Sequence, residues 1–429
     1  MKEINILFSS HNKTKSMIEI NIDTIEIRIL GIKSFYTITT CMNKLKGVLS
    51  SLEANDKSNY NISFESKSSD YQQTKILTEL HDILYSYTNN PTIKLSNVSK
   101  NIINIFDELK LYKDVVMDPN KNPDTYLKYI LSRIPKGYKS DVFKISKDKN
   151  YTPTKMFPLT KSVGMGSSYN SYFVHIKPKS INSKNKNVYL IGKAVTFDGG
   201  GLNLKGHGSH IEDMKVDMTG SAIIMSVLNL LSANKEDSKY NVHLIIPIVE
   251  NMINNTAIRP GMVVRSMNNK MVEIVNTDAE GRLCLADGIE YINMKLIDHK
   301  KDNIIIDIAT LTGNTDYISN GISCIIMGND ISSNHINKMI ETGENVGEYV
   351  DTLKLRPEYL DYLISPVGDI MNVAGPDVKC GCIEGGTFLN YFADPTIPWI
   401  HMDVASNTFI NRKPTSYGIS LLYNFIKLL

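Results

Sequence analysis

Three short clusters hold the side chains of this sequence that could do chemistry. The first, GKAVTFDGGGLNLK at 192–205, contains Lys193, Asp198, three consecutive glycines and Lys205 after a β-rich run. Glycines allow a ligand to approach the backbone closely, but a phosphate-binding loop would end in Gly-Lys-Ser/Thr, which this cluster lacks. Alone, the cluster fits a ligand site and a tight turn with solvated lysines equally well.

The second and third clusters add carboxylates. MKVDMTGSA places Asp217 directly before an apolar helical pattern, where an acidic side chain commonly caps the helix. NTDAEGRL is more informative, because Asp278, Glu280 and Arg282 would share one face of an extended segment. Neighbouring carboxylates repel each other unless a cation neutralises them, so we expect a divalent cation here rather than a surface salt-bridge cluster.

Together, the clusters carry enough negative charge for two divalent cations. Their four carboxylates are Asp198, Asp217, Asp278 and Glu280. Carboxylates that bridge two cations are typical of hydrolytic sites. The sequence has neither the His-Glu-x-x-His pattern of single-zinc proteases nor the Gly-x-Ser-x-Gly turn of serine hydrolases. We therefore predict a site for two divalent metal ions, and ligands of this type accept Zn, Mn or Mg.

Strand and helix patterns alternate from about residue 185 onward, and they must position these clusters. Strands are expected at 187–192, 243–249, 303–308, 323–327 and 399–404, and helices at 218–231, after 281, at 337–350 and at 385–392. Strands that are apolar on both faces indicate an α/β fold whose largely parallel mixed sheet is covered by helices. Ligands bind at the carboxyl ends of such strands.

The chain is also expected to divide into parts. We predict a smaller N-terminal α/β domain at 1–115, a linker helix with the start of the catalytic domain at 116–185, and a dinuclear-metal catalytic domain at 186–429.

The composition is that of an ordinary globular protein. The 429 residues include 47 Lys+Arg and 45 Asp+Glu, a net charge of +2 that disfavours nucleic acid as a partner. No apolar run reaches the roughly 18 residues of a membrane-spanning helix, and the start of the chain lacks the pattern of a secretory signal. The five cysteines are scattered and odd in number, which indicates free thiols in a reducing compartment. We therefore expect a cytoplasmic protein with no membrane partner.

Several cysteines and histidines could in principle bind metal or react, but we interpret them as incidental or structural. Cys380 and Cys382 lack the two-residue spacing of redox motifs and are taken as two incidental thiols. His207 and His210 lie in a glycine-containing loop and are taken as loop residues. His401 lies in an apolar run, so we expect a core histidine with satisfied hydrogen bonds.

The clusters resemble the leucyl aminopeptidase family, the two-metal cytosol aminopeptidases. NTDAEGRL at 276–283 matches the family signature without a change, and IGKAVTFDGGGLNLK at 191–205 and MKVDMTGSA resemble the two preceding motifs in the expected order. The segments DIATLTG at 307–313 and WIHMD at 399–403 also resemble family segments. The resemblance covers roughly residues 120–429, while the earlier residues share only the family's plan of a divergent N-terminal α/β domain.

The resemblance implies the role of each site residue. The implied metal ligands are Lys193, Asp198, Asp217, Asp278 and Glu280, with Asp198 and Glu280 bridging the two ions. Lys193 would bind through a neutral amine, which requires burial beside a cation to lower its pKa. Lys205 would polarise the scissile carbonyl and stabilise the gem-diolate transition state. Arg282 would hold a bicarbonate or a water relay that acts as general base toward a metal-bridging hydroxide. The implied side-chain pocket contains Met214, Thr310 and Gly313.

The activity that the resemblance implies is that of a metallo-exopeptidase. Its substrate would be a peptide or aminoacyl amide, from which a homohexamer releases a leucine-like or other apolar N-terminal residue. Two alternatives stay open: a catalytically silent homologue acting as an oligomeric scaffold or DNA-binding protein, and a two-metal hydrolase of phosphate esters or non-peptide amides. Lys205 and Arg282 disfavour the silent homologue, because such a copy is free to lose them. The neutral pocket residues Met214 and Thr310 disfavour a phosphate ester.

The sequence departs from the family pattern at positions that are neither ligands nor catalytic residues. The family usually has serine at Gly199, glycine at Ala194 and Thr219, and aspartate at Met262. We expect these changes to affect substrate preference and rate.

Overall fold

The computed structural model consists of two compact units. One comprises Met1–Asp114 with Gly343–Gly347, and the other comprises Val115–Thr342 with Glu348–Leu429. The structure describes residues 3–9, 18–20, 25–30, 38, 42, 45–46, 59–64, 70–85, 92–96, 98–145, 156–235, 239–298, 302–375 and 378–429. Cys41, expected to be a free thiol, lies outside these residues.

The first unit is an α/β arrangement built on a five-stranded sheet in the order β2-β3-β1-β4-β5. The strands are β1 (Glu3–Ser9), β2 (Ile18–Ile20), β3 (Ile25–Leu30), β4 (Asn59–Phe64) and β5 (Thr92–Ser96). All pairs are parallel except β2 with β3. Helix α2 (Asp70–Leu84) buries Ile76, Leu77 and Leu80 at three- and four-residue spacing, and α3 (Lys100–Met117) continues into the second unit.

The second unit is built on a nine-stranded mixed sheet. Its order is β15-β14-β17-β13-β8-β10-β7-β6, with β9 also paired to β10. The strands are β6 (Tyr138–Ile145), β7 (Ser171–Pro178), β8 (Lys186–Gly192), β9 (Ala194–Asp198), β10 (Tyr240–Asn251), β13 (Asn303–Ala309), β14 (Ser323–Gly328), β15 (Tyr349–Thr352) and β17 (Trp399–Asp403). The central strands β10, β8, β13 and β17 are parallel, while β6, β7 and β14 make antiparallel pairs.

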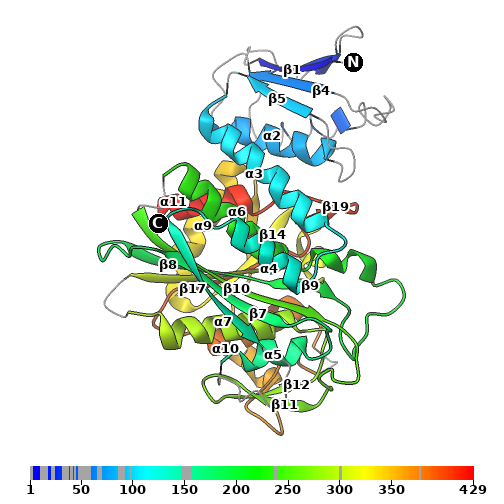
Figure 1. Ribbon diagram of the computed structural model, residues 1–429, viewed down its shortest axis with the longest axis vertical. Coiled ribbons are helices and arrows are strands. Elements are labelled where there is room, and N and C mark those ends of the chain that lie inside the picture. The colour runs from blue at the N-terminus through cyan, green and yellow to red at the C-terminus, as the bar shows by residue number, and fades with distance from the viewer. Residues whose placement is uncertain are drawn as a thin grey trace. The chain divides into compact units, whose positions relative to one another are not determined.

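Helices cover both faces of this sheet. In Figure 1, α4 and α6 lie on one side of the sheet of the second unit and α5, α7 and α10 lie on the other. The helices are α4 (Pro123–Ser132), α5 (Pro158–Gly164), α6 (Thr219–Ala233), α7 (Gly281–Lys295), α8 (Thr315–Ser319), α9 (Ser333–Val346), α10 (Gly381–Phe392) and α11 (Ile419–Leu428). Every residue of β13 is buried, as expected for a strand covered on both faces. The predicted fold class is confirmed.

Shorter elements complete the unit. The 3-10 turns are η1 (Ile211–Val216), η3 (Asp330–Ser332) and η4 (Pro357–Leu363). A small sheet joins β11 (Met262–Arg265), β12 (Met271–Ile274) and β16 (Ile370–Met371), and β18 (Phe409–Ile410) pairs with β19 (Lys413–Pro414).

One boundary and one local conformation differ from the sequence prediction. The helix expected at 337–350 is α9, which ends at Val346, and Tyr349 already begins β15. Gly347, with a φ of +70°, separates them, and glycine at the end of a helix tolerates this backbone shape. The extended conformation considered for residues 278–282 is wrong, because Asp278 lies in a turn and Arg282 lies in the first turn of α7.

The close approach of α6 to the sheet requires glycine at two positions. A methyl group on Gly192 would lie 2.4 Å from Ser221 Cα, and one on Gly220 would lie 2.1 Å from the Ile308 carbonyl oxygen. The Ser221 amide donates to the Lys193 carbonyl at 3.0 Å. This contact holds the start of α6, and Asp217 just before it, against the carboxyl end of β8.

One helical stretch among the described residues passes a membrane-span test by length and composition. It is Ile211–Ala233, and 83% of its most apolar window is buried inside the protein. Burial of this extent is typical of the core helix of a soluble protein, which passes the same test.

Candidate metal centre

The three sequence clusters meet at the carboxyl ends of β8 and β9. Lys193 follows β8, and its Nζ lies 2.8 Å from Asp217 Oδ1 and 2.9 Å from Glu280 Oε1. Asp198 ends β9, and Glu280 directly precedes α7. Lys193, Asp198, Asp217 and Glu280 are each at most 5% exposed. The structure thus encloses the first lysine with carboxylates from distant parts of the chain.

The second lysine lies at a more open side of the same group. Lys205 Nζ lies 2.8 Å from Asp198 Oδ2 and 2.7 Å from Asp278 Oδ1. Its side chain is 13% exposed and that of Asp278 is 32% exposed, compared with 4% for Lys193. The structure therefore brings together six of the predicted site residues, with Lys205 and Asp278 on the side that solvent reaches.

The glycine-rich loop folds back so that Lys205 can reach these carboxylates. Gly200 has a φ of +87°, and a methyl group there would lie 2.4 Å from the Asn203 carbonyl oxygen and 2.8 Å from Asp278 Oδ1. The Asn203 amide donates to Thr277 Oγ1 at 2.8 Å, and the Thr277 amide donates to Asn203 Oδ1 at 2.9 Å. These bonds tie the loop to the NTDAEGRL segment.

The carboxylates of the group are suited to holding cations. Oxygen atoms of Asp198, Asp217 and Glu280 all lie within 4.8 Å of one another. Asp217 Oδ2 and Glu280 Oε2 are buried and have no hydrogen-bond partner within the part of the chain that the structure describes. A buried carboxylate oxygen without a partner is costly unless a donor or a cation meets it. The described residues therefore include an acidic cluster able to bind metal.

The pKa values lead to the same conclusion. Burial, and then the negative charge of Asp198, raise the pKa of Asp278 to about 7. Burial raises the pKa of Asp217 well above its usual value, and burial together with the charge of Asp198 also raises that of Glu280. The carboxylates thus resist simultaneous ionisation when only protein groups surround them, and added positive charge would relieve this.

The lysines show the opposite balance. Burial by itself would lower the pKa of Lys193, but the charges of Asp217, Glu280 and Asp198 raise it above its usual value. Burial would also lower the pKa of Lys205, but the charges of Asp198 and Asp278 outweigh this effect and raise it above its usual value. With protein groups alone, both side chains are ammonium ions. The neutral amine implied for Lys193 would require a nearby metal cation, because its positive charge disfavours the ammonium form and lowers the pKa of Lys193.

Thr310 touches the group directly. Its Oγ1 donates to Asp217 Oδ1 at 2.8 Å, and its carbonyl oxygen accepts from Lys193 Nζ at 2.9 Å. Met214 lies in η1, where its carbonyl oxygen accepts from the Asp217 amide at 3.2 Å. Gly313 is exposed, and a methyl group there would meet nothing within 4 Å. The three predicted pocket residues therefore differ in exposure, since Gly313 is exposed whereas Met214 and Thr310 are partly buried.

Arg282 is buried beside the group, and its side chain is held by a residue outside it. Its Nη1 donates to the Asn372 carbonyl oxygen at 2.7 Å, while its Nε finds no hydrogen-bond partner among the residues described. Burial lowers the pKa of Arg282, and the charges of Glu384 and Glu280 oppose that change. A guanidinium in this setting stays charged.

Two supporting residues were not singled out in the sequence. Asn251, at the end of β10, donates through Nδ2 to Asp198 Oδ1 at 2.8 Å and to the Thr277 carbonyl at 3.0 Å. Asp403, fully buried at the end of β17, accepts from Thr312 Oγ1 at 2.5 Å and from the amides of Leu311 and Thr312 at 3.2 and 3.4 Å. Both lie at carboxyl ends of strands, which is the signal that could have identified them.

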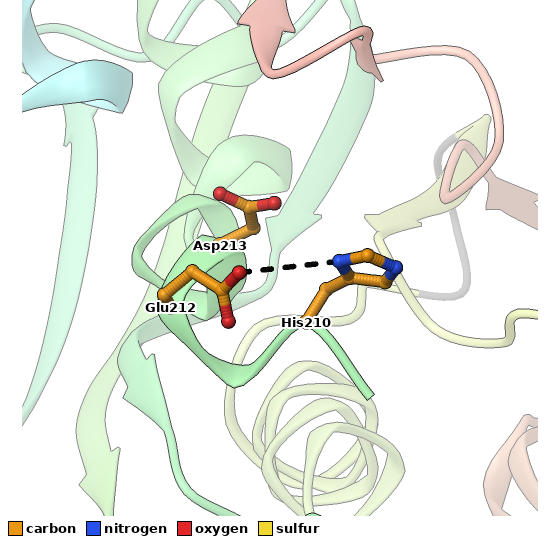
Figure 2. Close-up of side chains that lie close together, drawn as sticks. All are labelled: His210, Glu212 and Asp213. Atoms are coloured by element: carbon orange, nitrogen blue, oxygen red, sulfur yellow. Dashed lines mark ion pairs between the residues drawn. The ribbon is translucent and has the colours of Figure 1, made fainter. Parts of the chain in front are cut away.

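A second group of potential ligands lies apart from the first. Figure 2 shows His210, Glu212 and Asp213 close together. His210 Nδ1 lies 4.0 Å from Glu212 Oε1. Arg412 Nη2 lies 3.1 Å from Asp213 Oδ1, and Lys215 Nζ lies 3.5 Å from it. His210 and Glu212 are exposed. The side chains of Arg412 and Lys215 already neutralise the two carboxylates. We interpret this group as a surface ion-pair cluster.

His401 is only partly satisfied, unlike the sequence expectation. Its Nδ1 lies 2.5 Å from Asp307 Oδ1 on the neighbouring strand β13, and its ring is fully buried. Its Nε2 has no hydrogen-bond partner among the described residues. Burial would lower the pKa of His401, but the Asp307 carboxylate raises it.

The fold and this site define an α/β protein with a carboxylate-rich cluster, able to bind metal, at the ends of parallel strands. Residues 111–423 match the catalytic domain of the cytosol aminopeptidase family. The chain belongs to this family, as the resemblance of its motifs predicted.

Several curated relatives carry the name "probable cytosol aminopeptidase". The protein of Prochlorococcus marinus subsp. pastoris is 36% identical over 279 residues, which cover 62% of this chain and 54% of the relative. That of Nostoc punctiforme is 35% identical over 272 residues, covering 62% and 52%. A second Prochlorococcus marinus protein, of strain AS9601, is 34% identical over 328 residues, covering 73% and 63%. The chain spans about half the length of most of these relatives.

Proposed function

We propose that this chain is a metal-dependent aminopeptidase. It would hydrolyse the N-terminal peptide bond of a peptide or aminoacyl amide and release a leucine-like or other apolar residue. The observation that carries the proposal is the cluster of four carboxylates and two lysines, four of these six residues buried, in a chain of the cytosol aminopeptidase family. The names of the relatives support the same reaction class.

The proposed metal ligands are Lys193, Asp198, Asp217, Asp278 and Glu280, with Zn, Mn or Mg as the ions. Two bound ions would supply an activated water as nucleophile and a site for the free substrate amine. The unpartnered oxygens of Asp217 and Glu280 and the raised pKa values of the carboxylates support this assignment.

Lys205 is the proposed catalytic residue at the substrate carbonyl. Its side chain lies on the open side of the cluster, where a substrate from solvent would arrive. An ammonium at that place stabilises negative charge that develops on the carbonyl oxygen. Asp198 and Asp278 hold it in position from two sides.

Arg282 is proposed to hold a bicarbonate or a water relay that serves as general base. A buried guanidinium with an unpartnered Nε is suited to a small oxyanion or a water molecule. Met214, Thr310 and Gly313 are proposed to bound the pocket for the substrate side chain.

The remaining properties are proposals from family membership. We propose that the chain works as a homohexamer in the cytoplasm. We also propose the division into an N-terminal domain at 1–115, a linker segment at 116–185 and a catalytic domain at 186–429. A silent homologue is disfavoured, because every proposed ligand is retained and all five lie in one group.

A panel of aminoacyl amides tests the proposed function. Purified protein is assayed before and after exhaustive chelation, and again with Mn or Zn added back. We expect turnover of substrates with apolar, unblocked N-terminal residues, its loss on chelation and its return with metal. Full turnover after chelation, or equal cleavage of N-acetylated substrates, would contradict the proposal.

A further inference from the structure

The thiols of Cys380 and Cys382 lie next to each other at the start of α10. Their Sγ atoms are 3.7 Å apart. Cys380 is the residue before the helix, with a φ of −108° and a ψ of 77°, and Cys382 is its second residue. Within a helix, side chains two positions apart point to different sides. The two sulfurs meet because Cys380 lies outside the helical conformation.

The approach of the sulfurs is close to what a disulfide requires. A disulfide has an S–S distance of about 2.05 Å, so the sulfurs would need to approach by about 1.7 Å. Gly381, which lies between them, has no side chain to obstruct this movement. Rotation about the two Cα–Cβ bonds with a small backbone adjustment at Gly381 is the motion required.

The two sulfurs differ in their access to solvent. Cys380 is partly exposed, while Cys382 is fully buried and packs with Ile325 and Met327 of β14. Burial and the neighbouring Cys380 raise the pKa of Cys382 to about 12. A reagent from solvent therefore meets Cys380 first, with a second thiol held directly behind it.

We propose that Cys380 and Cys382 form a redox-active dithiol that a low-molecular-weight disulfide, such as glutathione disulfide, oxidises to an intramolecular disulfide. The Cys380 thiolate attacks the S–S bond of the reagent, which forms a mixed disulfide and releases one small thiolate. The Cys382 sulfur then attacks the Cys380 sulfur, and the second small thiolate leaves. The two cysteine protons pass to the released thiolates. The protein dithiol is oxidised by two electrons, and the reagent is reduced to two thiols.

The first turn of α10 connects this pair to the candidate metal centre. A methyl group on Gly381 would lie 2.4 Å from Asn314 Oδ1, in the segment that follows Gly313. One turn further on, a methyl group on Gly385 would lie 2.9 Å from Leu311 Cδ2 and 3.6 Å from Arg282 Nη2. Packing this close transmits small displacements. We therefore expect the disulfide to lower turnover, an effect that rests on the proposed function, whereas formation of the disulfide does not.

Thiol counting after oxidation tests the proposal independently of activity. The full-length protein is incubated with glutathione disulfide, denatured, alkylated and mapped by mass spectrometry. We expect free thiols to fall from five to three, with Cys380 and Cys382 joined. Cys382→Ala should stop at a glutathione adduct on Cys380, because the second thiol is missing. Cys380→Ser should keep all four of its remaining thiols free, and serine is favoured at this position before a helix, so the variant should fold.

A matched control and a turnover assay complete the test. Cys324→Ala, at a buried thiol of β14, should still lose two thiols. Turnover of the oxidised wild type should fall and return with dithiothreitol, while that of Cys380→Ser should not respond to the reagent. A stable glutathione adduct on the wild type, or five unreacted thiols, would overturn the disulfide. Loss of two thiols with unchanged turnover would overturn its coupling to the metal centre.

Discussion

At the scale of single residues, the two lysines of the candidate metal centre have different surroundings. Lys193 is held by Asp217, Glu280 and the carbonyl oxygen of Thr310, and its side chain is 4% exposed. Lys205 bridges Asp198 and Asp278 on the open side of the cluster. The enclosed position suits a ligand, and the open position suits a group that contacts substrate.

Alanine substitutions should separate these two roles. Lys205→Ala should retain both metals and lose turnover by roughly 10²–10³, the usual cost of one oxyanion donor. Lys193→Ala should lose one metal, because the amine is itself a proposed ligand. Bound metal per chain and kcat are measured for both variants. Lys215→Ala, which removes a lysine from the separate ion-pair cluster of Asp213, is the control and should change neither. Metal loss in Lys205→Ala with retention in Lys193→Ala would reverse the assignment.

At the scale of elements, Asp287 of α7 replaces a missing cap of α5. The residue before α5, Phe157, makes no side-chain cap, and the Thr160 amide instead donates to Asp287 Oδ2 at 2.6 Å. Asp287 is fully buried, and this burial raises its pKa to about 8. Helix α5 is thus capped by a carboxyl group that is held largely protonated near neutral pH.

This carboxyl group should make stability depend on pH. The unfolded carboxyl group has a pKa of about 3.9. Between about pH 4 and 8 the unfolded chain has released a proton that the folded chain retains, so this contribution to stability falls as pH rises. Asp287→Asn keeps an acceptor for Thr160 but cannot titrate. Its free energy of unfolding should therefore decline less between pH 5 and 8 than that of the wild type. Equal declines in denaturant titrations would show that Asp287 ionises normally.

The segment after β13 depends on Asp403 of β17. Asp403 accepts three hydrogen bonds from Leu311 and Thr312, and the neighbouring Thr310 contacts both Lys193 and Asp217. Asp403 therefore helps to position Thr310, the residue that contacts both Lys193 and Asp217.

Thr312 provides a test of this anchoring. Thr312→Val removes the hydroxyl that donates to Asp403 and should cost about 1.5–3 kcal/mol, as for a hydrogen bond to a charged group. Because Thr310 would be less firmly held, bound metal and kcat should also fall. Thr312→Ser retains the hydroxyl and should restore both. A valine variant that loses stability but keeps full metal content would show that the bond serves the fold alone.

At the scale of the whole molecule, metal binding should stabilise the chain. A cation that binds only the folded state at a hundred times its Kd adds about 2.7 kcal/mol. Chelation should therefore lower the unfolding midpoint of the wild type in thermal or denaturant titrations. Glu280→Gln should begin with a lower midpoint and respond less to the chelator, because a buried residue that we propose as a ligand has lost its charge.

The separate ion-pair cluster offers a control for this experiment. Glu212→Gln removes a carboxylate that is exposed and paired with Arg412, so its response to chelation should equal that of the wild type. If chelation lowered the unfolding midpoint of Glu280→Gln as much as that of the wild type, the stabilising cations would bind at a site that does not include Glu280.

Much of the fold follows from local pattern. The strands β8, β13 and β17 lie where apolar runs predicted them, because a strand buried on both faces is apolar at consecutive positions. Helix α7 begins at Gly281, after which a helix was expected. The boundary between α9 and β15 was less predictable, because a helix pattern and a short buried strand share the same apolar residues over a few positions.

The sequence by itself determined the types of the site residues and their grouping at strand ends. Side-chain chemistry and chain order are properties of the sequence, and a carboxylate can be recognised as a candidate ligand wherever it stands. Matching of the motifs to the family also required no coordinates, since identity of neighbouring residues is a local property.

Only the tertiary structure decided which groups meet. Lys193 pairs with Asp217 and Glu280, whereas Lys205 pairs with Asp198 and Asp278, although both lysines come from one segment. Asn251 and Asp403 enter from other strands, and the sulfurs of the cysteine pair meet through one non-helical residue. These contacts arise because the sheet brings the carboxyl ends of separate strands to one edge, and distances across that edge depend on packing rather than on local sequence.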